Sequence, residues 1–162
     1  MSTVYHVLFL CKHNASRSLM AEAILNNVGQ GRFLAYSAGT EPSKVVHPYM
    51  LEVLHEEGFD TTNLRPKSIQ NFLDSHAPKM NLVIGLCNSL QQDETLDIQM
   101  ANHFPMIAHW HINDSESISG DNEAQKAAFS QVMRQLSQRI HLFANLPNDK
   151  VRHLTQLKTV EM

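Results

Sequence analysis

A cysteine and an arginine lie close together near the start of the chain, in the stretch "CKHNASR" from Cys11 to Arg17. A thiolate can attack a tetrahedral centre, and a planar guanidinium can pair with two oxygens of the same anion. Both groups lie on one short polar segment, which is able to wrap around a single ligand. This spacing therefore predicts a nucleophile and an anion-binding group that act together.

The residues on either side of this segment predict a strand, a tight loop and a helix. Residues 4–10 form an apolar run of strand length, and residues 18–28 carry apolar side chains at helical spacing until Gly29. A loop that enters a helix presents unpaired backbone N–H groups and the positive end of the helix dipole. The same field should lower the pKa of the Cys11 thiol, so that the reactive thiolate forms at neutral pH.

Several neighbours of Cys11 are expected to contribute to an oxyanion cradle. Asparagine tolerates a left-handed backbone, which suits Asn14 to the turn of the loop. The hydroxyl of Ser16 or Ser18 is able to donate a hydrogen bond to the thiolate. The predicted oxyanion-binding residues are Lys12, His13, Asn14, Ala15, Ser16, Arg17 and Ser18.

The rest of the chain alternates between strand and helix patterns. Strands are expected at 4–10, 32–38, 80–86 and 105–112, and helices at 18–28, 47–59, 68–75 and 123–143. Such alternation predicts a parallel sheet covered on both faces, with ligands beyond the carboxyl ends of the strands. We expect one domain over residues 1–147 and a tail, 148–162, that adds a turn of helix or frays.

Composition limits the class of protein. The 162 residues are 43% hydrophobic, which fits one domain with a sizeable core, and the net charge of -3 gives no reason to expect nucleic acid as a partner. No apolar run approaches membrane-spanning length and the first residues do not resemble a secretion signal, so a cytoplasmic location is expected. Two cysteines are too few for a disulfide scaffold. The ten histidines show no convergent ligand set, so neither a metal nor another cofactor is expected.

The segment "VLFLCKHNASRSLMAEAIL" resembles the active-site region of the low-molecular-weight protein tyrosine phosphatases, and more closely that of the arsenate reductases that share their fold. The resemblance continues through "SAGTEP", "HPYMLEVLHEEGFD", "RPKS", "LVIGLC" and "HW". It implies a four-stranded parallel sheet flanked by helices. It also implies that Cys11 attacks the oxyanion, that Arg17 and the loop amides hold it, and that Asn14 and Ser18 shape the loop.

The family's general acid is an aspartate in a late loop, usually followed by proline. In "HWHINDSES" the matching residue is Asp114, with Ser115 in place of the proline. A carboxylic acid there is able to protonate the leaving oxygen. The alternatives are that Asp114 only forms a turn or caps a helix, and that Asn113 or Glu116 is the functional neighbour.

Cys87 distinguishes the possible functions. In reductases similar to this chain, a cysteine after the third strand attacks the cysteine–arsenic adduct, forms a disulfide with the nucleophile and releases arsenite. "LVIGLC" supplies Cys87, but no third cysteine follows to pass the disulfide on. An external thiol, of the glutathione and glutaredoxin or mycothiol type, is therefore the expected partner. It would reduce either the Cys11 adduct directly or a Cys11–Cys87 disulfide. The other interpretation of Cys87 is an inert buried residue.

Three functions follow from this resemblance. Arsenate reduction with an external thiol ranks first. Hydrolysis of phosphotyrosine through a cysteinyl phosphate is the alternative, because it needs only Cys11, Arg17 and an acid such as Asp114. A module that binds phosphate or another oxyanion without catalysis is the third, although binding alone needs neither a thiolate nor an acid.

Overall fold

The computed structural model describes residues 4–74, 76–86, 107–112, 120–155 and 159–161. The strands are β1 (Tyr5–Cys11), β2 (Phe33–Gly39), β3 (Leu82–Gly85), β4 (Ile107–His109) and β5 (Thr159–Glu161). The helices are α1 (Arg17–Val28), α2 (Pro48–Glu56), α4 (Asn122–Ala144) and α5 (Asn148–Thr155), with a 3-10 helix η1 (Ile69–Phe72).

All strand pairs in the sheet are parallel, in the order β2-β1-β3-β4-β5. The expected four parallel strands flanked by helices are confirmed. The tail adds a fifth strand of three residues, which pairs with β4. Sequence patterns had no means of indicating this strand, because so short an edge strand has no periodicity of its own.

Two further expectations need correction. The helix expected at 68–75 is a single turn of 3-10 helix, capped by the side chain of Ser68, which accepts a hydrogen bond from the Gln70 amide. Of the strand expected at 105–112, Ile107–His109 form β4 and residues 110–112 do not continue it, while residues 105 and 106 lie outside the described residues. Although β4 ends there, the Trp110 amide still donates to the carbonyl of Gly85 in β3, which keeps this segment beside the sheet.

Alternate residues of β1 point into two separate cores. Val7 and Phe9 belong to the larger core, whereas Leu8 and Leu10 belong to the smaller one. This follows from the two-residue period of a strand, which sends successive side chains to opposite faces. All four side chains are almost completely buried, and β1 pairs with β2 on one side and β3 on the other, so the strand that ends at Cys11 lies inside the sheet.

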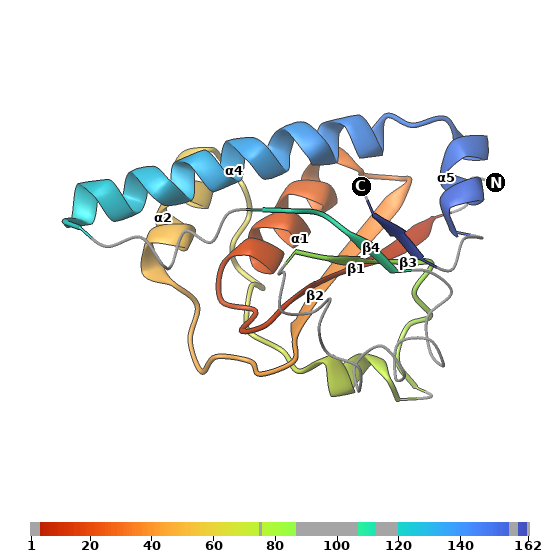
Figure 1. Ribbon diagram of the computed structural model, residues 1–162, viewed down its shortest axis with the longest axis horizontal. Helices are drawn as coiled ribbons and strands as arrows, with labels where there is room; N and C mark the ends of the chain where they lie inside the picture. The colour runs from red at the N-terminus through yellow and green to blue at the C-terminus, as the bar shows by residue number, and fades with distance from the viewer. Residues whose placement is uncertain (1–3, 75, 87–106, 113–119, 156–158, 162) are drawn as a thin grey trace.

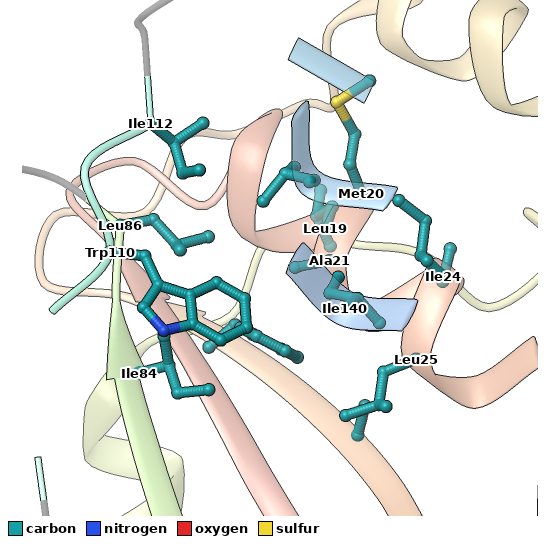
Figure 2. Close-up of a cluster of buried hydrophobic side chains, with 14 of the residues drawn as sticks. Leu19, Met20, Ala21, Ile24, Leu25, Ile84, Leu86, Trp110, Ile112 and Ile140 are labelled. Carbon is teal, nitrogen blue, oxygen red and sulfur yellow. The ribbon is translucent and has the colours of Figure 1, made fainter. Parts of the chain in front are cut away.

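Helices α1, α2 and α4 lie together on the face of the larger core, and η1 lies on the other side of the sheet (Figure 1). Figure 2 shows side chains of α1 facing Ile140 of α4, with Trp110 and Ile84 on the sheet side. The buried residues of α1 include Leu19, Met20, Ile24 and Leu25. Burial of each such side chain stabilises the fold by about 1.5–3 kcal/mol. This packing therefore fixes the orientation of α1 against the sheet and α4.

Helix α5 packs on the same larger core as the rest of the chain, because Val151 is 1% exposed there. Arg32, just before β2, donates to the carbonyl oxygens of Ala144 and Leu146 and to Oδ1 of Asn148. The predicted domain boundary at residue 147 thus falls between two helices that both pack on the larger core. Within the described residues, no helix is both long and apolar enough to cross a bilayer.

Candidate active site

Cys11 is the last residue of β1, and its Cα pairs with that of Gly39 at the end of β2. The residue is only 5% exposed, so its sulfur lies at the base of the following loop and not on the surface. Cys11 is disulfide-bonded in the structure, and none of the described cysteines is free. The sequence contains one other cysteine, Cys87, which lies outside the described residues.

The backbone of the loop after Cys11 is held from behind by residues 41–47. The carbonyl oxygens of Lys12, His13 and Ala15 accept hydrogen bonds at 2.8, 2.8 and 3.1 Å from the amides of residues 41, 43 and 47. In a planar trans peptide the C=O and the next N–H point in opposite directions. The amides that follow these carbonyls therefore point away from the supporting segment, which is the orientation an anion-binding loop requires.

Asn14 turns the loop, as the sequence predicted. Its φ of 50° is left-handed, and among the described non-glycine residues it is the one with positive φ. The side chain is completely buried: Nδ2 donates to Oγ of Ser18 at 2.6 Å, and Oδ1 accepts from the amide of Lys67 at 2.8 Å. Asn14 therefore joins the loop to α1 and to a segment more than fifty residues away in sequence.

Helix α1 begins at Arg17 with Ser16 as its N-cap residue, and the Ser16 side chain makes no capping hydrogen bond. No acidic residue lies in the first turn, so nothing there competes with an anion for the positive end of the helix dipole. Nη1 of Arg17 donates to the carbonyl oxygens of Leu86 at 3.2 Å and Ile112 at 3.1 Å. These two contacts orient the guanidinium across the ends of β3 and β4, where an anion held by the loop would lie.

The first two loop side chains form an exposed rim. Lys12 pairs with Glu41 at 3.4 Å, and Nδ1 of His13 lies 3.1 Å from the Glu41 carbonyl oxygen. An exposed ion pair of this kind contributes at most about 1 kcal/mol. Both side chains therefore remain accessible to a ligand. The buried residues of the loop, from Asn14 to Ser16, determine its conformation.

Gly39 is required by the close approach of β2 to the loop. A Cβ at this position would lie 2.7 Å from the carbonyl oxygen of Lys12 and 3.0 Å from the amide nitrogen of Asn14. Both of these atoms belong to the backbone, so no flexible side chain can move aside. The sequence contained this residue in "SAGTEP", but the pattern alone gave no reason for the glycine.

The sequence analysis assigned no role to a largely buried cluster of Lys67, Glu22 and Ser37 near the loop. Lys67 lies within 3.4 Å of both Glu22 Oε1 and Ser37 Oγ, and Ser37 donates to the same carboxylate at 2.8 Å. The Lys67 and Glu22 side chains are 15% and 12% exposed. Burial is the main cause that lowers the pKa of Lys67 below its ordinary value, against the opposing attraction of Glu22. A lone acidic residue in the apolar "LMAEAIL" was the one available signal.

Two predicted site residues cannot be placed in this geometry. Cys87 and Asp114 both lie outside the described residues, so their roles stay predictions. The structure does bring together Cys11, the loop amides, Arg17, Asn14 and Ser18. Among the residues that the structure describes, no group of three or more His, Cys, Asp or Glu is arranged to hold a metal ion.

A buried cysteine at the end of an inner parallel strand, followed by an inward-facing amide loop and a helix, defines an α/β protein with a phosphatase-type anion loop. The family model described as low molecular weight phosphotyrosine protein phosphatase matches residues 6–154. The chain belongs to this family.

Known relatives extend the comparison. The glutaredoxin arsenate reductase of Synechocystis sp. is 37% identical over 81 residues. These residues cover 50% of this chain and 59% of that protein, so the match spans less than two thirds of the relative's length. The arsenate reductase of Bacillus subtilis is 28% identical over 138 residues, covering 85% and 94% of the two chains. A solved structure described as an arsenate reductase in the phosphate binding state aligns with a TM-score of 0.68 at 26% identity, covering 87% and 97%.

Proposed function

We propose that this protein is an arsenate reductase in which Cys11 is the nucleophile. The observation that carries the proposal is the loop after β1, where the carbonyls of Lys12, His13 and Ala15 are all bound from behind. A loop of this kind at the start of α1 suits a tetrahedral oxyanion of the size of arsenate or phosphate. The names of the relatives support arsenate as the substrate.

In the first step of the proposed reaction, the thiolate of Cys11 attacks arsenic and displaces one hydroxyl group. Asp114 donates a proton to that hydroxyl, which leaves as water. Arg17 and the loop amides hold the remaining oxygens throughout. No electrons change hands in this step, because a bond from sulfur to arsenic(V) replaces a bond from oxygen to arsenic(V).

In the second step, the thiolate of Cys87 attacks the sulfur of Cys11. A disulfide bond forms while the sulfur–arsenic bond breaks, and its electron pair stays on arsenic, which leaves as arsenite. The two sulfurs are oxidised by two electrons and arsenic(V) is reduced to arsenic(III). The sequence offers Cys87, the one cysteine besides Cys11, as the second sulfur for this step.

An external thiol must then reduce the disulfide, since the chain has no further cysteine. We propose a glutathione and glutaredoxin or a mycothiol system as this partner, and the cytoplasm as the location, where such thiols keep cysteines reduced. The word glutaredoxin in the name of the Synechocystis relative supports the first of these systems.

A second candidate function is hydrolysis of phosphotyrosine, which the description of the matching family favours. Cys11 would attack phosphorus while Arg17 holds the phosphate oxygens, and Asp114 would protonate the phenolic oxygen so that tyrosine leaves. Water would then release phosphate from Cys11. The test is steady-state kinetics of the reduced protein with arsenate plus glutathione and glutaredoxin, and separately with an aryl phosphate. We expect the larger kcat/KM with arsenate; turnover of the aryl phosphate alone would reject the reductase.

A further inference from the structure

Lys67 contacts three parts of the structure around Cys11: the anion loop, α1 and β2. Its amide donates to Oδ1 of Asn14 at 2.8 Å, and its carbonyl oxygen accepts from the amide of Gly39 at 2.8 Å. Its ammonium contacts Glu22 on α1 and Ser37 on β2. One residue thus joins the loop, α1 and β2.

Three oxygen atoms lie around the ammonium group of Lys67. Nζ is 2.8 Å from the carbonyl oxygen of Arg65, and 3.4 Å from both Glu22 Oε1 and Ser37 Oγ. Ser37 is completely buried, and the side chain of Glu22 is 12% exposed. A charge in such surroundings persists only when it is paired and hydrogen-bonded, so the position of Lys67 is tightly restricted.

Lys67 affects the site through its hydrogen bond to Asn14. The main-chain N–H of Lys67 fixes which way the Asn14 amide points, so that Nδ2 faces Oγ of Ser18. Asn14 also carries the left-handed turn that orients the loop. A shift of the Lys67 backbone would therefore release the Asn14 side chain and with it the loop amides around Cys11.

We propose that Lys67 is a positioning residue for the oxyanion loop: its ammonium, anchored by Glu22 and Ser37, holds its own backbone where it locks Asn14. The proposal rests on the proposed function only in that the loop binds a tetrahedral oxyanion. Neither of its tests requires arsenate reduction, so the failure of one claim does not imply the failure of the other.

The test uses the reduced full-length protein and the variants Lys67→Met, Lys67→Arg and Arg32→Met. One readout is the dissociation constant for inorganic phosphate. The other is the rate of iodoacetamide alkylation of Cys11 against pH, followed on the Cys11 peptide by mass spectrometry. Arg32→Met is the matched control, because Arg32 is also a cation bound to carbonyl oxygens, but it precedes β2 at the opposite end of the sheet from Gly39.

In Lys67→Met we expect phosphate binding to weaken about tenfold, as commonly follows loss of a residue that supports binding groups from behind. We also expect the pH midpoint of Cys11 alkylation to rise, since the amides that stabilise the thiolate lose their order. Lys67→Arg should recover part of both properties, and Arg32→Met should lower the melting temperature without changing either.

Wild-type phosphate binding and wild-type alkylation in Lys67→Met would overturn the proposal. Equal changes in Lys67→Met and Arg32→Met would also overturn it, because they would reflect general destabilisation. If Lys67→Met does not fold, Ser37→Ala tests the same claim by removing one oxygen beside the ammonium. We expect a smaller change in the same direction, and no change in either readout would reject the proposal.

Discussion

Arg17 makes two hydrogen bonds to the backbone beside the site. Its Nη1 is tied to the carbonyl oxygens of Leu86 and Ile112, which places the flat guanidinium across the strand ends. A planar fork fixed in this way can present further donors to an anion in a defined direction. A lysine ammonium cannot satisfy both carbonyls and also make a bidentate contact with a ligand.

Arg17→Lys is therefore expected to lower kcat/KM for arsenate by about 10- to 100-fold, because hydrogen bonds to charged groups contribute about 1.5–3 kcal/mol each. Steady-state kinetics with glutathione and glutaredoxin measure this. Arg139→Lys is a suitable control, since Arg139 belongs to the long helix α4 and its guanidinium lies 5.9 Å from the centre of the Trp110 ring. A wild-type rate in Arg17→Lys would mean that Arg17 only caps the strand ends.

The close contact between Gly39 of β2 and the loop leads to a separate prediction. In Gly39→Ala the new Cβ would meet backbone atoms of Lys12 and Asn14 at 2.7 and 3.0 Å, so the loop has to shift. Displacement of a positioned group by about 1 Å can cost 100-fold in rate. We expect a loss of this order in arsenate turnover per folded molecule, measured alongside circular dichroism.

Gly31→Ala provides the control for this change. Gly31 also has little tolerance for a side chain, because its φ is +85°, but no atom lies within 4 Å of its added Cβ. This variant should lose about 1 kcal/mol of stability and keep its activity. If Gly39→Ala instead retains full activity, the loop does not depend on close contact with β2.

The elements near Cys11 were predictable because their signals are local. The apolar run of β1, the polar loop and the spacing of α1 follow one another in about twenty residues, and Asn14 takes the left-handed turn that its residue type favours. The supporting contacts were not predictable in the same way. Lys67 and Asn14 are 53 positions apart, and no periodicity relates an amide on one segment to a side chain on the other.

The same contrast holds for the remaining elements. The stripe of apolar residues predicted α4 almost to its ends, with Asn122–Ala144 observed against 123–143 expected. By contrast, η1 was overestimated because a single 3-10 turn and a short helix share the same apolar spacing. The length of β5 gives no pattern, so the pairing of the tail with β4 emerges only from the structure.

The tail contributes to the stability of the fold. Val151 of α5 is buried in the larger core, and Arg32 binds carbonyl oxygens at the end of α4 and the side chain of Asn148. In a chain that ends at residue 147, the free energy of unfolding should fall by about 1.5–3 kcal/mol, because the buried side chain of Val151 is missing. Urea denaturation of the truncated and full-length chains measures this, and equal midpoints would show that the tail adds nothing.

The free energy of unfolding at alkaline pH should depend on the protonation of Lys67. Burial lowers the pKa of this group below its ordinary value of 10.5. Between the lowered pKa of the folded protein and 10.5, the unfolded chain binds more protons at this position, so the free energy of unfolding rises with pH. The cost of burying the charge is thus present at lower pH and is removed as the pH rises through this window.

Urea denaturation of wild type and Lys67→Met from pH 8 to 10.5 isolates this contribution, because the other titrating groups are common to both proteins. The stability of wild type relative to Lys67→Met should increase across the range. A constant or decreasing difference would contradict the lowered pKa of Lys67.

The central claim is that the chain itself reduces arsenate through Cys11 and Cys87. It is tested most directly by one turnover of the reduced protein with arsenate and no external thiol, with arsenite and the disulfide state both measured. We predict about one arsenite per chain together with a Cys11–Cys87 disulfide, since two thiols supply the two electrons, and no arsenite from Cys11→Ser or Cys87→Ser. Release of arsenite by Cys87→Ser at the wild-type yield, or no arsenite from wild type, would contradict the account.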